Sequence, residues 1–147
     1  MKIAVGCDHG GVEHKNAIAE HLKNRGFEVV DFGVFKPESV DYPDIAVKVT
    51  GAVTSGECEK GILVCGTGIG MSIAANKVKG IRAAACSDHF SAKYTRLHND
   101  ANILCLGGRV IGVGTTLELT DLFIDTPFEG GDRHKRRIDK ISEIEKN

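Results

Sequence analysis

The sequence has no excess of charge of either sign and no long apolar run. Its 147 residues include 19 Lys and Arg against 20 Asp and Glu, a formal net charge of -1. Nucleic acids and membrane surfaces are bound through an excess of basic residues, so this balance predicts neither as a partner. No stretch of about 18 consecutive apolar residues occurs, and we therefore expect no transmembrane helix.

Targeting and cross-linking signals are missing too. The N-terminus lacks the charged start, apolar stretch and small-residue cleavage site of a signal peptide, which predicts a cytoplasmic protein. The five cysteines are odd in number and include no C-x-x-C pair, so we expect free thiols rather than a disulfide framework or structural zinc. Since repeats and linkers are also absent, residues 1–147 are predicted to form a single domain.

What is present is an alternation of short apolar segments with longer segments of helical period, which is typical of a parallel sheet with crossover helices. The predicted strands are Lys2 to Cys7, Glu28 to Phe32, Gly61 to Cys65, Ile81 to Cys86 and Asn102 to Leu106. Helices are predicted over 11–25, from Pro43, from about Ser72, after Ser87 or Asp88, over 113–124 and from about Arg133. We therefore expect a three-layer α/β/α domain around a five-stranded parallel sheet.

Periodicity also predicts which side chains share a face in two of the helices. In the helix after residue 88, one face carries Phe90, Tyr94 and Leu97. In the last helix, the residues predicted to point inward are Ile138, Ile141 and Ile144. The rest of that last helix is predicted to be solvated.

Ligands of open parallel sheets bind beyond the carboxyl ends of the strands. Polar residues and glycines follow three of these ends, in Cys7-Asp8-His9-Gly10-Gly11, Cys65-Gly66-Thr67-Gly68-Ile69-Gly70 and Gly107-Gly108-Arg109. Free amide N–H groups at a helix start favour an anion and the ionised form of a nearby thiol. Cys65 is thus predicted to be a reactive thiol beside an oxyanion site; an inert buried cysteine and a purely structural turn stay open.

Other loop motifs fit less well. A cysteine-dependent phosphatase would need an arginine six residues after the thiol, and a G-x-G-x-x-G fingerprint would need a glycine, but position 71 is Met in both alignments. Asp88 does stand where a ribose-binding acid would, so a nucleotide-binding regulatory module remains an alternative of a different class. Asp8, His9 and His14 lack a further ligand at a recognisable spacing, and no metal is predicted.

Basic residues near the end of the chain indicate an anion-binding site. Arg133 and Arg137 are four residues apart, so both guanidinium groups project from one helical face and could grip a phosphate. A solvated basic helix start is the competing interpretation. His98 ends a predicted helix, where a cation also interacts favourably with the helix dipole.

Taken together, these motifs resemble ribose-5-phosphate isomerase type B, a family that also contains galactose-6-phosphate and allose-6-phosphate isomerases. The resemblance spans residue 3 to about 144. It is carried, in chain order, by Gly6-Cys7-Asp8-His9-Gly10, Asp41-Tyr42-Pro43, Gly61 to Ala75, His98-Asn99-Asp100-Ala101-Asn102, Gly107-Gly108-Arg109, and Glu129-Gly130-Gly131 followed by Arg-His.

The resemblance implies a Rossmann-like fold, no cofactor, and a homodimer with active sites at the subunit interface; whether dimers pair into tetramers is left open. The implied reaction interconverts ribose 5-phosphate and ribulose 5-phosphate through an enediol in the pentose phosphate pathway. In family terms Cys65 is the proton-transfer base and His98 assists opening of the furanose ring.

The remaining roles implied by the resemblance concern substrate binding. Contacts to hydroxyls and the ring oxygen match Thr67, Asp8 and Asn99. The enediolate oxyanion matches the backbone of Gly66, Gly68, Ile69 and Gly70. Phosphate contacts match His9, Arg133 and Arg137, and a further ligand contact matches Arg109.

One departure from the family pattern affects the arginines. Asp132 stands between Gly-Gly and Arg-His, which the family joins directly. The insertion could shift the register by a residue, so Arg136 competes with Arg137 for the phosphate. Within the same family, isomerisation of a six-carbon sugar phosphate such as allose 6-phosphate or galactose 6-phosphate is the alternative reaction.

Overall fold

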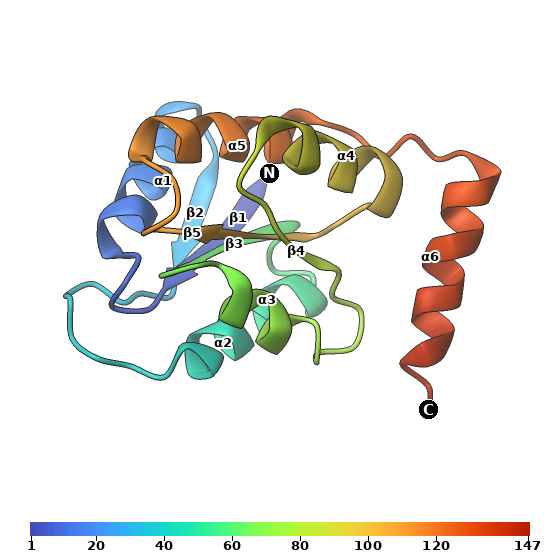
Figure 1. Cartoon of the computed structure of the whole chain (residues 1–147), viewed down its shortest axis with the longest axis horizontal. Helices are drawn as coiled ribbons and strands as arrows, with labels where there is room; N and C mark the ends of the chain where they lie inside the picture. Colours follow the sequence, from blue (N-terminus) through green and yellow to red (C-terminus); the bar gives the residue numbers. More distant parts are fainter.

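A computed structural model of the chain describes all 147 residues and confirms the three-layer α/β arrangement (Figure 1). Five parallel strands form one sheet in the order β2-β1-β3-β5-β4. The strands are β1 Lys2–Cys7, β2 Glu28–Asp31, β3 Lys60–Cys65, β4 Ala83–Ala85 and β5 Ile103–Gly107. The helices are α1 Val12–Asn24, α2 Tyr42–Thr54, α3 Ile69–Ala75, α4 His89–Asn99, α5 Val113–Asp125 and α6 Asp132–Ile144.

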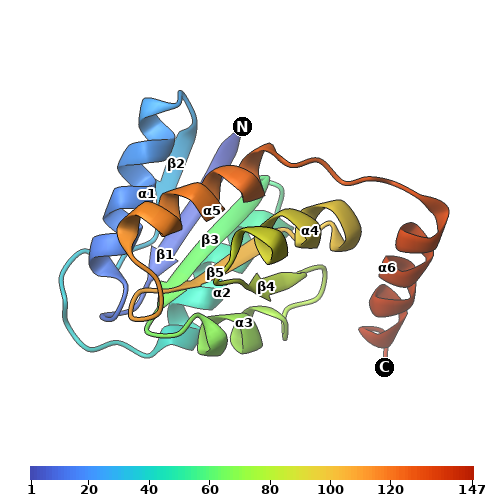
Figure 2. The same ribbon diagram turned by 45° about the horizontal axis from the view of Figure 1, so that its top comes forward.

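Helices cover both faces of the sheet. Helices α1, α5 and α4 pack side by side on one face, and α2 and α3 on the other (Figure 2). The central strands are therefore buried on both sides, which explains why β3 and β5 read as continuous apolar runs. Two predicted elements differ by more than one residue at a bound: β4 is only three residues long, and α3 begins at Ile69 rather than near Ser72.

Phe90 and Tyr94 share a face of α4, as predicted, and their rings stack, but the predicted inward face of α6 is wrong. In α4 the buried residues are Ala92, Thr95 and Arg96, while Phe90 is 68% exposed. In α6 the isoleucines are mostly outside the core, and Ile144 is 68% exposed. The reason is that the segment after α5 carries α6 away from the sheet (Figure 1). Of the other helices and strands, only α4 has substantial contact with α6. Its apolar stripe has no layer of the same chain beneath it.

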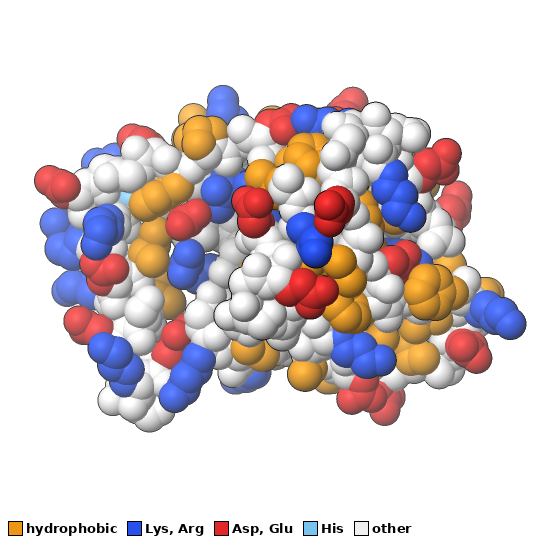
Figure 3. Space-filling view, turned by 180° about the vertical axis from the view of Figure 1, so that it is seen from behind, with side chains coloured by type: hydrophobic (Ala, Val, Ile, Leu, Met, Phe, Trp, Pro, Cys, Tyr) orange, Lys and Arg blue, Asp and Glu red, His pale blue; other side chains and the backbone are white.

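A hollow of about 410 Å³ lies between α6 and the β4 edge of the sheet. Its apolar lining includes Ile81, Ile141 and Ile144. From behind, hydrophobic side chains follow this hollow beside α6, which is on the left in this view (Figure 3). None of the helices has the length and apolar character needed to cross a membrane.

Candidate active site

Cys65 is the last residue of β3, and the glycine turn folds back over its sulfur. The backbone N–H of Gly68 donates to Cys65 Sγ at 3.1 Å. Gly68 has a φ of 81°, and a Cβ there would lie 3.0 Å from the carbonyl carbon of Leu106. Glycine is therefore required twice over, by the left-handed conformation and by the close backbone. The turn presents an amide N–H to the thiol, as the sequence predicts.

Two neighbouring loops are fastened to the same turn. Gly108 N donates to Cys65 O at 2.8 Å, and Arg109 N donates to Gly66 O at 3.0 Å. On the other side Asp8 N donates to Val64 O at 3.1 Å. These bonds follow from the adjacency of β1, β3 and β5 in the sheet. The structure thus brings the predicted residues of three loops to one edge.

The side chains at this edge of the sheet differ in their exposure and in their hydrogen bonds. Asp8 is 7% exposed, and its Oδ1 accepts a hydrogen bond from Gly10 N at 2.8 Å. Thr67 is exposed, and its Oγ1 accepts from Ile69 N at 3.2 Å. His9 is also exposed, with Val40 N donating to its Nδ1 at 3.5 Å. A fixed carboxylate and accessible groups therefore surround the turn.

The other thiols are set apart from Cys65 by their environments. All five cysteines are free, as predicted. Burial raises the pKa of Cys7 and of Cys86 to about 11, and it raises the pKa of Cys58 and, still further, that of Cys105. Cys65 differs in that its sulfur accepts a hydrogen bond from a backbone N–H, that of Gly68.

His98 and Asn99 lie at the opposite end of the sheet. Helix α4 begins beyond the carboxyl end of β4 and runs back, so its last turn precedes the amino end of β5 (Figure 2). Cys65 ends β3, which is parallel to β5, and a six-residue strand spans roughly 20 Å. One chain therefore does not bring His98 and Asn99 to Cys65.

At that opposite end, His98 belongs to an aromatic cluster. Its ring stacks on His134 with 4.3 Å between centroids and meets the ring of Tyr94 edge-on at 4.9 Å. Glu129 Oε2 lies 3.7 Å from His98 Nε2 and 3.9 Å from His134 Nε2. Sequence patterns alone gave His134 no firm role and placed Tyr94 only on one face of a helix. The spacing of four between Tyr94 and His98 was the signal for their contact.

Positive charge gathers around this cluster. Burial lowers the pKa of His134, and the nearby charges of His98, Arg133 and Arg137 lower it further. Both arginines are exposed and neither forms an ion pair with a carboxylate. Arg136 instead lines a separate hollow whose other residues are all charged, namely Asp132, Lys135, Asp139, Lys140 and Glu143. The pair near His98 is therefore Arg133 and Arg137.

Donor atoms of His98, Glu129 and His134 lie within 4.8 Å of one another, which raises the question of a metal. An imidazole lone pair lies in the plane of its ring, and the two rings are stacked at only 10°. Their lone pairs thus run in nearly parallel planes and do not converge on one ion. His14 is likewise turned to the carbonyl of Ile111, at 2.8 Å, rather than to Asp8.

The proposed nucleotide-binding acid has a structural role. Asp88 is the N-cap of α4, and its carboxylate accepts from Ser91 N at 2.8 Å. This bond lowers the pKa of Asp88. The helix cap accounts for an acid at this position without a ribose, which weakens the dinucleotide interpretation.

Comparison with known proteins decides the family. A sequence model described as Ribose/Galactose Isomerase matches residues 3–141. The chain belongs to this family. Among its relatives, "Ribose-5-phosphate isomerase B" of Escherichia coli (strain K12) is 49% identical over 98% of this chain and 96% of its own length.

Other members of the ribose/galactose isomerase family agree in fold. A solved structure of Clostridium thermocellum ribose-5-phosphate isomerase B has a TM-score of 0.97 at 57% identity, covering 99% of this chain and 98% of that one. The "D-erythrulose-4-phosphate isomerase" of Pectobacterium atrosepticum is 44% identical over 89% of this chain and 87% of its own length. Family members of similar sequence thus carry names of different sugar phosphates.

Proposed function

We propose that this chain interconverts ribose 5-phosphate and ribulose 5-phosphate, with Cys65 as the base. The observation that carries the proposal is the Cys65 sulfur at the end of β3, held by the N–H of Gly68 in a glycine turn. Two relatives named as this isomerase, at 49% and 57% identity over almost the whole chain, support the choice of substrate.

The reaction needs ring opening followed by proton transfer. In ring opening the O1 hydroxyl loses its proton, ring O4 gains one, and the C1–O4 bond breaks to give an aldehyde at C1. His98 is the group that we assign to these proton movements. The Cys65 thiolate then removes the C2 proton, forming an enediolate with negative charge on O1.

The second half of the reaction returns the proton. Cys65 delivers it to C1, O1 is protonated, and the O2 hydroxyl loses its proton as C2 becomes the carbonyl. The amide N–H groups of Gly66, Gly68, Ile69 and Gly70 are suited to stabilise the oxyanion, since preorganised donors are worth most where charge develops. Asp8, Thr67 and Asn99 are assigned to the sugar hydroxyls and ring oxygen.

Two copies of the chain are required for this site, because His98 and Cys65 lie at opposite ends of one sheet. We infer a homodimer in which the Cys65 edge of one copy faces the His98 end of the other. The unpaired Arg133 and Arg137 then hold the phosphate together with His9, and Arg109 makes a further contact to the ligand. The exposed apolar stripe of α6 and the hollow beside it support burial against a partner.

Substrate length is tested by comparing kcat/KM for ribose 5-phosphate, allose 6-phosphate and D-erythrulose 4-phosphate. The proposal predicts the highest value for ribose 5-phosphate. A higher kcat/KM for allose 6-phosphate would identify the six-carbon sugar phosphate as the substrate instead. No turnover of any of the three esters would favour a binding module. A cytoplasmic location stays a prediction from the sequence.

A further inference from the structure

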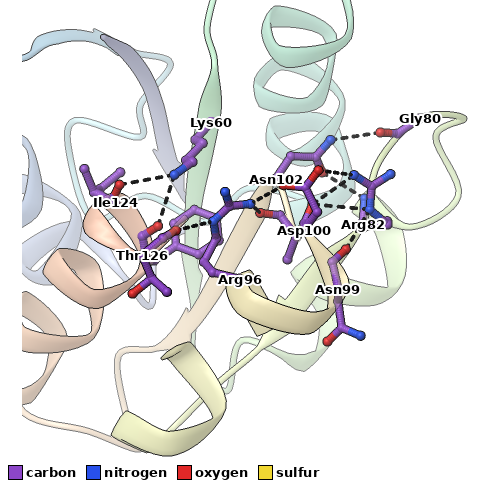
Figure 4. A network of polar contacts seen from close by, with 11 residues as sticks. Lys60, Gly80, Arg82, Arg96, Asn99, Asp100, Asn102, Ile124 and Thr126 are labelled. Carbon is purple, nitrogen blue, oxygen red and sulfur yellow. Dashed lines mark hydrogen bonds and ion pairs between the residues drawn. The ribbon is translucent and has the colours of Figure 1, made fainter. Parts of the chain in front are cut away.

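The turn that follows His98 is gripped by a buried arginine. Arg96 is 7% exposed, and its Nη1 donates to Asp100 Oδ1 at 2.7 Å and to Ala101 O at 2.8 Å. Its Nε donates to Thr126 O at 3.1 Å, just beyond the end of α5 (Figure 4). One guanidinium therefore ties the end of α4 to the segment that leads to Glu129.

A second arginine holds the same turn from the other side (Figure 4). Arg82 Nε donates to Asn99 O at 2.9 Å, and Arg82 Nη2 donates to Asp100 O at 2.9 Å. Asn102 Oδ1 in turn accepts from Arg82 N at 2.8 Å. The Asn99 side chain points away from Arg82, so the grip is on the backbone and the amide stays available to a ligand.

Asp100 links the two arginines. Its Oδ1 bonds Arg96 and its Oδ2 lies 3.5 Å from Arg82 Nη2. Its backbone is left-handed, with a φ of 46°, and it is the only residue other than glycine with positive φ. Aspartate and asparagine tolerate this conformation better than most residues. The direction in which the chain leaves His98 and Asn99 thus depends on this residue.

Lys60 adds a third cation behind the turn. Its Nζ donates to the carbonyls of Phe123 and Ile124 at 3.2 Å (Figure 4). Burial and, next, the charge of Arg96 lower the pKa of Lys60 to about 8, while Asp100 acts in the opposite direction. Besides linking the arginines, the Asp100 carboxylate partly offsets this clustered positive charge, as Glu59 and Asp125 do.

We propose that Asp100 is a positioning residue for ring opening, holding His98 and Asn99 toward the partner's sugar through Arg96 and Arg82. This inference rests on the proposed function, because it assigns ring opening to His98. Asp100 does not touch the sugar in this proposal. Its effect is on the placement of two groups, and a misplacement of about 1 Å can cost roughly 10²-fold in rate.

The test uses Asp100→Asn in the full chain, which keeps the size and the tolerance of positive φ but removes the charge. We expect kcat for ribose 5-phosphate to fall by about 10- to 10²-fold. Asp121→Asn is the matched control: Asp121 Oδ1 also bridges two basic groups, His21 at 2.8 Å and Arg25 at 2.7 Å, and its side chain is 38% exposed against 39% for Asp100. The control should keep the unaltered rate.

A second readout separates positioning from general damage. Ribulose 5-phosphate has no ring to open, because its O5 carries the phosphate, whereas ribose 5-phosphate must first open. With enzymatic ring opening impaired, consumption of ribose 5-phosphate stops rising at high enzyme concentration, where spontaneous opening becomes limiting. Consumption of ribulose 5-phosphate remains proportional to enzyme. A general structural loss keeps both directions proportional.

The proposal is overturned if Asp100→Asn keeps the unaltered rate, or if its rate falls but stays proportional to enzyme in both directions. Arg82→Lys provides a second variant should Asp100→Asn fail to fold, since a lysine cannot donate a fork to the carbonyls of Asn99 and Asp100. For Arg82→Lys, the rate of ribose 5-phosphate consumption should also level off at high enzyme concentration, with a smaller fall in kcat. A rate that stays proportional to enzyme would refute the positioning role of the Arg82 hydrogen bonds. Failure of the proposed function looks different: the unaltered chain would convert neither pentose phosphate.

Discussion

The two ends of the sheet are built by different means. At the carboxyl end, backbone groups make the site: Gly68 donates to Cys65, and main-chain bonds fasten the neighbouring loops. At the amino end, side chains make it, through the stack of His98 on His134 and the ion network around Asp100. The first end is suited to stabilise a developing negative charge. In the proposed mechanism, the second supplies proton transfer and positive charge for a phosphate.

The largest expected effect comes from the backbone-built end. Cys65→Ala should lower kcat by about 10²–10⁴-fold or more, because the proposed mechanism assigns the C2 proton to this thiol. Ribose 5-phosphate should still bind, as measured by calorimetry, since the phosphate is held elsewhere. Cys58→Ala, another buried thiol, is the control and should keep its activity. Near-normal turnover by Cys65→Ala would remove the thiol from the reaction.

His98→Ala tests the side-chain-built end and should have the next largest effect. We expect a fall in kcat for ribose 5-phosphate of about 10²-fold. The rate of ribose 5-phosphate consumption should level off at high enzyme concentration, while that of ribulose 5-phosphate should not. His21→Ala, whose imidazole pairs with Asp121, serves as control. A proportional response for His98→Ala would contradict its role in ring opening.

Arg137 and Arg136 lie on different faces of α6, and replacing each in turn tests which face binds the phosphate. Arg137→Ala should raise KM about tenfold with little change in kcat, because the phosphate is bound throughout the reaction and a charged hydrogen bond contributes about 1.5–3 kcal/mol. Arg136→Ala should leave KM unchanged, since Arg136 lies among Asp132, Asp139 and Glu143 on another face. Steady-state kinetics decides, and the reverse pattern would move the phosphate to Arg136.

The smallest effect concerns stability. The pKa of Lys60 falls from 10.5 to about 8 on folding, so between these pH values the unfolded chain binds more protons and stability rises with pH. The cost of the buried ammonium is fully present below pH 8. Relative to Lys60→Met, the unaltered chain should gain on the order of 1 kcal/mol over this window. Urea unfolding measures this, with Lys2→Met as control; a gain no larger than that of the control would contradict it.

The carboxyl-end site was the more predictable one. Glycine runs after apolar strands report directly on backbone geometry, so Asp8, Cys65, Gly68 and Arg109 could be placed at one edge from the alternation of strands and helices alone. The bounds of β1 were also correct, because continuous apolar runs mark central parallel strands. Family membership, read from the motifs, was confirmed.

The amino-end site was not predictable in the same way. The contacts of Arg96 with Thr126, of Asp100 with Arg82 and of Glu129 with His98 join segments that are distant in sequence, and residue type does not encode such pairings. The inward face of α6 was also mistaken, because apolar periodicity predicts burial without saying whether the same chain supplies the cover. The exposure of Ile141 and Ile144 follows from that ambiguity.

The central claim, that one site combines Cys65 of one copy with His98 of another, is tested by mixing two inactive variants. Cys65→Ala and His98→Ala chains are unfolded together and refolded in equal amounts. Random pairing makes half of the dimers hybrid, each with one intact site, so about a quarter of the unaltered activity should return. If both residues acted within a single chain, no hybrid would hold an intact site, and the mixture would stay as inactive as its parts.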